Sequence, residues 1–523
     1  MISSLFKHTW DIWDFLISWA PLVSVVLIIL DAVFVLTRAV ISPSRNVPGP
    51  FYARFTDLWY LRRLYQGNFE EENLHLHEKY GPIVRLGPNR FSFSHPDALK
   101  AIYGPSAANL FPKSPSYRPA SPPDPDKWTL FADEDIKRHA RNRRLYQSTY
   151  SMSSLVTYEA YVDECIDLFS LRLSELADAG FEADMGHWFQ FFAFDVIGLI
   201  TYSKRLGFLD RGDDVGSIIK TIDDEMVYFV AVGVYSFLHK LLFPIRNWLA
   251  GKKGIGRTYL MNFTKERVKE HQSQQRAVST EDAESKQVPL DFLSKFFGKH
   301  TADPSKFTLC HVFAGCASNI VAGSDTTATS LSGIFYHLLR NPEALQRLRH
   351  EIQECDRRTQ KGNVSWAESQ DMPYLQAVIK ESLRLHTAVA LPMERVVPQG
   401  GAEINGYYFP EGTFVGINNW VYHRNKAIFG EDAGKFRPER WLTGDSEQIS
   451  IMNRNLISFG AGARTCIGRH IAALQMSKLV PRLVRDFDMT LCEDISGPSH
   501  HWKTKNYFFL KPTNFHVLLR ARK

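Results

Sequence analysis

The side chains of this sequence best suited to chemistry lie in Phe459–Gly468, which reads FGAGARTCIG and precedes a helical pattern that starts at Arg469. Gly460 and Gly462 permit a tight backbone bend close to a flat ligand. Cys466 is expected where the helix begins, and a helix N-terminus lowers the pKa of a thiol toward the thiolate. The segment therefore predicts a cysteine whose sulfur can ligate a metal.

Two more residues of this segment suit the same ligand. Gly468 leaves room for a macrocycle to lie against the helix, and Arg464 can pair with a carboxylate of that macrocycle. A glycine-rich loop with an incidental buried cysteine is the alternative, and any three of these residues would prove little. The whole pattern is more specific because five positions match at fixed spacing: Phe459, Gly462, Arg464, Cys466 and Gly468.

The segment resembles the haem-binding loop of the cytochrome P450 family, in which the cysteine is the axial ligand of the haem iron. The resemblance runs from about residue 45 to the C-terminus. Residues 391–425, LPMERVVPQGGAEINGYYFPEGTFVGINNWVYHRN, are most similar to fungal microsomal members of the pisatin demethylase and benzoate hydroxylase type. It implies the cytochrome P450 fold, mainly α with a small β portion, and haem b as cofactor. It also implies haem-binding roles for Cys466, Arg464, Phe459, Gly460, Gly462 and Gly468.

A second motif of the family is Ala322-Gly-Ser-Asp-Thr-Thr327, within an apolar helix predicted from about Thr308 to Arg340. A Thr hydroxyl that bonds to the preceding turn can open a helix locally, and Gly323 would leave space for dioxygen. Asp325 beside Thr326 is an acid–alcohol pair suited to passing protons. Alone, the motif would favour a Ser/Thr-rich patch of a plain core helix. With Cys466 downstream, it predicts proton delivery to iron-bound oxygen.

A third motif joins Glu381 and Arg384 in the helical run PYLQAVIKESLRLH. Residues at i and i+3 share a helix face and can bond directly. The surrounding apolar residues favour burial, and a buried ion pair needs a further partner. In the family that partner is an arginine of a later Pro-Glu-Arg segment, which is Arg440 here. We expect Glu381, Arg384 and Arg440 to form a structural triad without a catalytic role.

Basic residues provide the last two motifs. In the helix KRHARNRRL, His139 and Arg143 share a face. The family usually has a Trp and an Arg there to hold one haem propionate, so His139 replaces the Trp, while Arg395 corresponds to the arginine that reaches the other propionate. The opposite face could dock an acidic electron donor, although a merely solvated basic helix is the alternative. That face carries Lys137, Arg141 and Arg144.

Composition excludes several classes of protein. The 523 residues are 44% hydrophobic, and 62 basic against 56 acidic residues give a net charge of +6, too small an excess to imply nucleic acid. The six cysteines form no CxxC pair, which argues against a zinc site and a disulfide scaffold and fits a reducing compartment.

Phe15–Leu36 is apolar apart from Asp31, and as a helix it would be roughly 33 Å long, enough to cross a bilayer core of about 30 Å. A signal peptide and a buried core helix are the alternatives. Arginines after the span put the large domain in the cytosol by the positive-inside rule, so we expect a single-pass protein of the endoplasmic reticulum membrane. Its parts would be a lumenal N-terminus (1–14), a transmembrane anchor (15–37), a Pro-rich linker (38–50) and one haem-binding monooxygenase domain (51–523).

Local patterns predict a β hairpin from Ile83–Leu86 and Arg90–Phe93, and short strands within Ala388–Gly416. Between these regions the pattern is mostly helical, with an exposed polar loop at Gln272–Gln287. The family resemblance places the substrate pocket among Gly104–Trp128, Met226–Leu242, Asn319–Thr326 and Thr387–Met393.

The expected function is that of a haem-thiolate monooxygenase that inserts one oxygen atom of O2 into a lipophilic small molecule, by hydroxylation or oxidative demethylation, in fungal secondary metabolism. Electrons would come from NADPH through a separate membrane-bound reductase, since the sequence has no convincing flavin or dinucleotide motif. Two alternatives remain open. One is a haem-thiolate isomerase or dehydratase, which has less need for Asp325 and Thr326. The other is a non-catalytic haem sensor.

Overall fold

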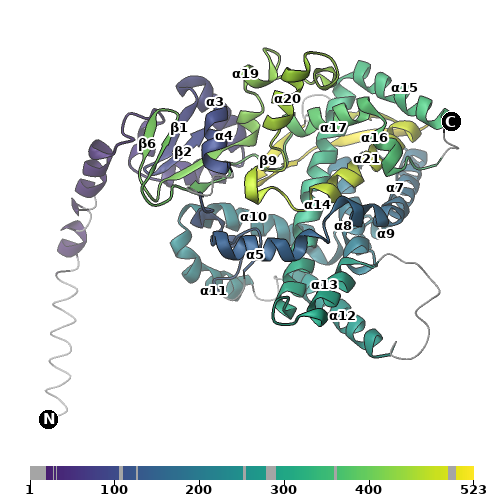
Figure 1. Ribbon diagram of the computed structural model, residues 1–523, viewed down its shortest axis with the longest axis horizontal. Helices are drawn as coiled ribbons and strands as arrows, with labels where there is room; N and C mark the ends of the chain where they lie inside the picture. The colour runs from purple at the N-terminus through teal and green to yellow at the C-terminus, as the bar shows by residue number, and fades with distance from the viewer. Residues whose placement is uncertain are drawn as a thin grey trace, which may run out of the picture.

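Helix α14 (Leu309–Arg340) runs through the middle of the protein, and other helices surround it (Figure 1). It begins where the Thr308 N–H donates to His311 Nδ1 at 3.1 Å and closes a capping box. The predicted span of this helix is confirmed. α14 packs against α8 (Met185–Tyr202), which is apolar on all sides and therefore buried.

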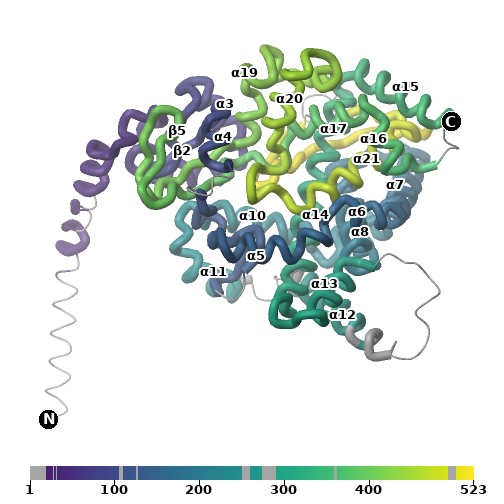
Figure 2. The backbone as a smooth tube through the Cα atoms, viewed as in Figure 1, coloured from purple at the N-terminus to yellow at the C-terminus, as the bar shows by residue number. Residues whose placement is uncertain are grey.

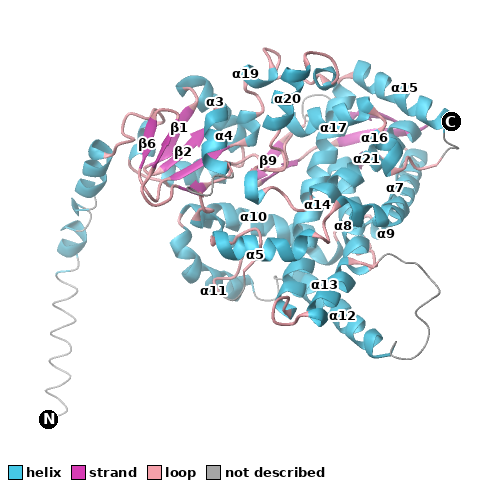
Figure 3. Ribbon diagram, in the orientation of Figure 1, coloured by secondary structure: helices cyan, strands magenta, loops and turns pink. Residues whose placement is uncertain are grey.

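The computed structural model describes residues 19–522 apart from 20, 27–28, 31, 105–109, 125–127, 251–254, 278–289, 359–361 and 493–501. Most of this chain is helical, as Figure 3 shows, so the expected mainly α architecture with a small β portion is confirmed. The other α-helices are α2 (Leu58–Tyr65), α3 (Phe69–Tyr80), α4 (Pro96–Tyr103), α5 (Ile136–Gln147), α6 (Met152–Leu155), α7 (Glu159–Ala179), α9 (Phe208–Arg211), α10 (Ile218–Val234), α11 (His239–Ala250), α12 (Ile255–Ala277), α13 (Phe292–Ala302), α15 (Pro342–Arg358), α16 (Trp366–Gln370), α17 (Pro373–Leu385), α18 (Asn419–Tyr422), α19 (Lys426–Phe429), α20 (Ser446–Asn455) and α21 (Arg469–Asp486). Short 3-10 helices include η1 (Phe51–Arg54), η2 (Pro115–Ala120), η5 (Ser236–Leu238), η7 (Pro438–Trp441) and η8 (Gly462–Arg464).

The largest sheet has the strand order β1-β2-β7-β4 and joins segments far apart in the chain (Figure 2). β1 and β2 form the predicted antiparallel hairpin, and β2 pairs in parallel with β7. The other sheets are β3-β11-β8, β9-β10 and β5-β6. The strands are β1 (Ile83–Gly87), β2 (Arg90–Phe93), β3 (Glu182–Asp184), β4 (Arg395–Val396), β5 (Ala402–Ile404), β6 (Tyr407–Phe409), β7 (Phe414–Ile417), β8 (Phe487–Leu491), β9 (Thr504–Tyr507), β10 (Phe509–Pro512) and β11 (His516–Ala521).

Two predicted segments differ from the structure. Of the polar loop expected at Gln272–Gln287, the part up to Ala277 belongs to α12, and the rest lies outside the described chain. Glu, Gln, Lys and Arg are good helix formers, and no Pro or Gly interrupts them there. In the expected linker, Val47 is fully buried and the Arg85 N–H donates to the Pro48 carbonyl at 2.8 Å. Residues 44–50 thus pack on β1.

The predicted membrane anchor, residues 15–37, lies partly outside the described chain. Within the described residues, Ala32–Ile41 forms an apolar helix of limited length, and no single helix combines the length and hydropathy that a membrane span requires. One pair of helices, Val215–Val234 and Ser236–Leu249, meets these criteria jointly but is bent by 117°.

Candidate functional site

The segment Phe459–Gly468, here called the cysteine loop, contains η8 and leads into α21. Gly468 is the N-cap of that helix. The Cys466 N–H donates to the Phe459 carbonyl at 2.8 Å and closes the loop on itself. Gly460 and Gly462 have φ values of 76° and 63°, which is the left-handed region that favours glycine. Both glycines therefore allow the tight bend that the sequence predicted.

Cys466 lies three residues before α21, and its side chain is exposed. Burial of its surroundings raises the pKa of the Cys466 thiol, while the backbone N–H groups of Gly468 and Arg469 and the charge of Arg143 act in the opposite direction. The start of α21 thus acts on this thiol in the direction that the sequence predicted, while desolvation acts against it. A bound metal ion would deprotonate such a thiol directly.

On α14, the Thr326 hydroxyl donates to the Ala322 carbonyl at 2.7 Å, which is the bond to the preceding turn expected from the sequence. Ala322 is exposed in the middle of this helix, one turn after Ser318, which is also exposed. A Cβ on Gly323 would lie 3.1 Å from Ile197 of α8, so this glycine faces α8. The expectation that Gly323 makes space for dioxygen is not supported, because close packing of two helices already accounts for a small residue there.

Asp325 is fully buried and its carboxylate is engaged away from Thr326. Gln190 of α8 donates to Asp325 Oδ1 at 2.8 Å, and the Lys511 ammonium of β10 lies 2.7 Å from Oδ2. Lys511 also pairs with Asp223 of α10 at 2.5 Å. The predicted acid thus belongs to an ion-pair network that joins three elements, which local sequence patterns gave no reason to expect.

Basic side chains from four segments gather near the cysteine loop. Burial and the Arg395 charge lower the pKa of Arg464 to about 10. Within the described chain, its buried Nη1 and Nη2 atoms have no hydrogen-bond partner. Burial lowers the pKa of His139 to about 3, and the charges of Arg464, Arg143 and Lys113 act in the same direction. The charges of Arg143 and Arg395 thus act on both His139 and Arg464.

Lys113 completes this group, and sequence reasoning missed it. The residue lies in the Pro-rich segment before η2, where no helical or strand period marks which side faces inward. An isolated antiparallel bridge pairs its backbone with that of Arg395. The only local signal in the sequence is that Lys113 lies between two prolines, Pro112 and Pro115, which restrict the backbone around it.

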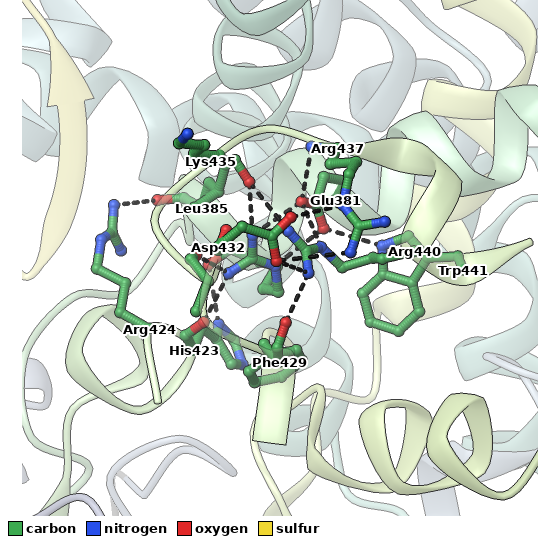
Figure 4. Close-up of polar contacts among 12 residues, drawn as sticks. Glu381, Leu385, His423, Arg424, Phe429, Asp432, Lys435, Arg437, Arg440 and Trp441 are labelled. Atoms are coloured by element: carbon green, nitrogen blue, oxygen red, sulfur yellow. Dashed lines mark hydrogen bonds and ion pairs between the residues drawn. The ribbon is translucent and has the colours of Figure 1, made fainter. Parts of the chain in front are cut away.

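The triad is assembled as predicted (Figure 4). Glu381 Oε1 accepts from Arg384 Nη2 at 2.8 Å and from Arg440 Nε at 2.9 Å. Its Oε2 accepts from Arg384 Nε at 2.9 Å and from Trp441 Nε1 at 3.0 Å. Both arginines also donate to backbone carbonyls, including that of Lys435. These bonds fix α17 to η7 in a buried layer, and the triad contributes no group to the cysteine loop.

An aromatic cavity is lined by three of the four segments expected to form the substrate pocket. Tyr117 of η2 and Phe229 of α10 lie with ring centroids 6.2 Å apart, and Phe229 meets Phe508 at 5.1 Å. α14 does not contribute to this cavity. Phe237, which belongs to the expected pocket segment Met226–Leu242, is instead 71% exposed at the surface.

Comparisons with known proteins agree with this architecture. The family described as Cytochrome P450 matches residues 47–519. A cytochrome P450 monooxygenase of Aspergillus terreus is 40% identical over 463 residues, covering 85% of this chain and 90% of the relative. A pisatin demethylase of Fusarium vanettenii is 35% identical over 519 residues, covering 97% and 95%. A cytochrome P450 monooxygenase of Emericella nidulans is 36% identical over 485 residues, covering 91% and 94%.

A mainly helical domain with a cysteine loop before a long helix, and basic groups around it, is the arrangement expected of a haem-thiolate oxidoreductase. The chain belongs to the cytochrome P450 family and is a monooxygenase. The resemblance to fungal members of the pisatin demethylase type is thereby confirmed.

Proposed function

We propose that this protein inserts one oxygen atom of O2 into a lipophilic small molecule, by hydroxylation or oxidative demethylation, in fungal secondary metabolism. The names of its relatives support the reaction type, since two of them are pisatin demethylases. The observation that carries the proposal is that one loop, Phe459–Gly468, holds both the exposed Cys466 and the buried Nη atoms of Arg464, which have no hydrogen-bond partner in the described chain. A thiol and an uncompensated guanidinium on one loop suit a ligand with a metal centre and a carboxylate.

Haem b fits these residues. Cys466 would hold the iron through its sulfur, while Gly460, Gly462 and Gly468 would keep side-chain bulk away from the macrocycle and Phe459 would lie next to it. Arg464, Arg395 and Arg143 would supply positive charge for the two propionates, and the neutral His139 would supply a hydrogen-bond donor. Burial and neighbouring cations lower the pKa values of Arg464, Arg143 and His139, as expected for a cluster that bound anions would neutralise. When bound, the haem supplies the oxygen-activating chemistry, which a thiolate ligand favours.

The side chains of α14 would control protons at the site. The Thr326 hydroxyl can move its hydrogen bond from the Ala322 carbonyl toward a bound polar group, since both partners lie within one helical turn. Asp325 would exchange protons with the solvent-facing Asp223 through Lys511 only if that ion-pair network opens. Thr326 would therefore donate directly to a bound polar group, and Asp325 would be a more distant source of protons.

Electrons would come from NADPH through a separate reductase. Lys137, Arg141 and Arg144 of α5 are exposed, so they offer a positive surface to an acidic partner on the side of the helix opposite His139. Electrostatic steering of this kind depends on ionic strength. Neutralisation of all three charges should weaken reductase docking and flatten the salt dependence of the reduction rate.

We further propose a single-pass anchor at residues 15–37 in the endoplasmic reticulum membrane, with the large domain in the cytosol. Exposed apolar side chains on η5 and α11 support contact with lipid, since Phe237, Trp248 and Leu249 are 71%, 80% and 68% exposed. Protease protection of a tag before residue 15 in intact microsomes tests the topology. Digestion of that tag without detergent would contradict it.

Reduced carbon monoxide difference spectra of the full-length protein test the central assignment. The wild type should give the thiolate signature, and Cys466→Ser should lose it. Cys310→Ser is the matched control, because Cys310 is also exposed but lies in the first turn of α14. A thiolate signature retained by Cys466→Ser would overturn the proposal. Screening lipophilic compounds for a spin-state shift, followed by NADPH consumption with product, then identifies the substrate and excludes a sensor.

A further inference from the structure

Lys113 is a buried lysine with little to neutralise it. Lys113 is 7% exposed, and its Nζ donates to the Phe131 carbonyl at 2.5 Å. The ammonium also lies 4.0 Å from the ring centroids of both Tyr117 and Phe131. An ammonium group has three donors and a full charge. One carbonyl and two ring faces in the described chain offset only part of the cost of burying it.

The backbone fixes Lys113 beside a second cation. The Lys113 bridge to Arg395 is reinforced by the Val396 N–H, which donates to the Pro112 carbonyl at 2.9 Å. Burial lowers the pKa of Lys113 well below its usual value, and the charges of Arg395 and Arg464 lower it further. The backbone bridge thus places Lys113 next to Arg395, and the charge of Arg464, from a third segment, also acts on its ammonium.

The carboxylates that act on these cations are already engaged. Asp133, which stabilises the charge of Arg464, accepts two hydrogen bonds from Arg138 at 2.8 and 3.0 Å. Glu394 pairs with Arg90 and accepts from the hydroxyls of Ser114 and Ser116 at 2.9 and 2.7 Å. Within the described residues, the cluster thus carries more positive charge than its own acids balance. A ligand with two carboxylates would supply the difference.

We propose that the Lys113 ammonium binds a haem propionate together with Arg395 and Arg464, in a chain where His139 stands at the position of the family's usual tryptophan. The inference rests on the proposed haem-thiolate function. A neutral histidine offers a propionate one donor and no charge, whereas an ammonium gives a charge-assisted hydrogen bond. The rings of Tyr117 and Phe131 hold Nζ in position, and the backbone bridge to Arg395 fixes the separation of Lys113 from that arginine.

The test compares Lys113→Met, Lys113→Arg and Lys295→Met as full-length holoproteins. Lys295 is the matched control, since its Nζ also donates one hydrogen bond, to Ser154 Oγ at 2.7 Å, and lies 4.6 Å from the Tyr158 ring. Lys113→Met should release haem to apomyoglobin about tenfold faster, as expected for loss of a charged hydrogen bond. Its haem midpoint potential should also become more negative, because the reduced haem loses a nearby positive charge. Lys113→Arg should restore both values in large part, and Lys295→Met should change neither.

The propionate-bending bands of the resonance Raman spectrum give a direct readout that needs little protein. They should shift in Lys113→Met and not in Lys295→Met. If Lys113→Met yields no holoprotein, Lys113→Gln keeps a donor for the Phe131 carbonyl and carries the same comparison. Unchanged bands, potential and release rate would overturn the inference while the wild-type thiolate signature stands. Loss of that signature in the wild type would instead overturn the proposed function itself.

Discussion

The Lys511 ammonium lies 2.7 Å from the Asp325 carboxylate and ties the central helix α14 to Asp223 on α10. Burial alone would lower the pKa of Lys511, but the charges of Asp325 and Asp223 together raise it. α10 also carries Phe229, which lines the aromatic cavity. The acid next to Thr326 is therefore electrostatically connected to the helix that borders the expected substrate site.

Replacing Lys511 by Met should destabilise the protein by about 3 kcal/mol, because Asp325 would stay buried without its cationic partner. Urea denaturation measures this, and Lys511→Arg should recover part of the loss. Lys306→Met is the control. The Lys306–Asp303 pair has a similar distance of 3.0 Å but an exposed lysine, so its loss should matter by less than about 1 kcal/mol. Equal effects of the two Met variants would contradict the role of the network.

Acid should destabilise the protein below about pH 6.5, because several buried histidines are held neutral. Burial lowers the pKa of His386 to about 3, with smaller contributions from His337 and Arg424. His423 is lowered to about 3 mainly by burial as well. The unfolded chain therefore binds protons from an ordinary value of 6.5 downward while the folded protein does not. Between pH 6.5 and 3, each such histidine should remove about 1.4 kcal/mol per pH unit.

His386→Phe isolates one of these protons. Between pH 6.5 and 3, unfolding of this variant should take up one proton fewer than unfolding of the wild type, since phenylalanine cannot titrate. The slope of the unfolding free energy against pH should be smaller by the same amount. At pH 8 the histidine is neutral in both states, so any difference there reflects packing alone and serves as the internal control. A pH dependence identical to the wild type would mean that His386 does not stay neutral in the fold.

Glu381→Gln should prevent accumulation of folded, haem-loaded protein, because it leaves Arg384 and Arg440 buried without their shared carboxylate. Breaking such a buried arrangement costs about 3–5 kcal/mol. Circular dichroism and haem content measure the result. Glu431→Gln, at an exposed pair with Lys426, is the control and should leave both unchanged. Normal stability with lost activity would instead point to a catalytic role for Glu381.

Gly462→Ala should distort the cysteine loop. A Cβ there would lie 2.0 Å from the Tyr103 carbonyl oxygen, at a residue whose φ is already in the left-handed region. The strain of about 1–3 kcal/mol, added to the backbone shift, should lower haem content and thermal stability together. Gly434→Ala is the matched control, since nothing lies within 4 Å of its added Cβ. Full haem loading in Gly462→Ala would show that the loop tolerates the shift.

The sequence by itself predicted the features that depend on residue type at fixed local spacing. The hairpin at Ile83–Phe93 follows from alternating apolar residues around a Gly-Pro-Asn turn. The span of α14 follows from its apolar period and the cap at Thr308. The left-handed glycines of the Cys466 loop and the Glu381–Arg384 pair also depend on neighbours within a few residues.

Tertiary structure alone decided which distant side chains meet and how much water remains around them. Lys113 beside Arg395 and Lys511 beside Asp325 join segments separated by much of the chain, so no local period could indicate them. The pKa of Cys466 is raised although its helix position favours the thiolate, since desolvation depends on everything packed around it. Local geometry is determined by short-range sterics and hydrogen bonds, whereas charge energies depend on burial and on neighbours that only the folded chain brings together.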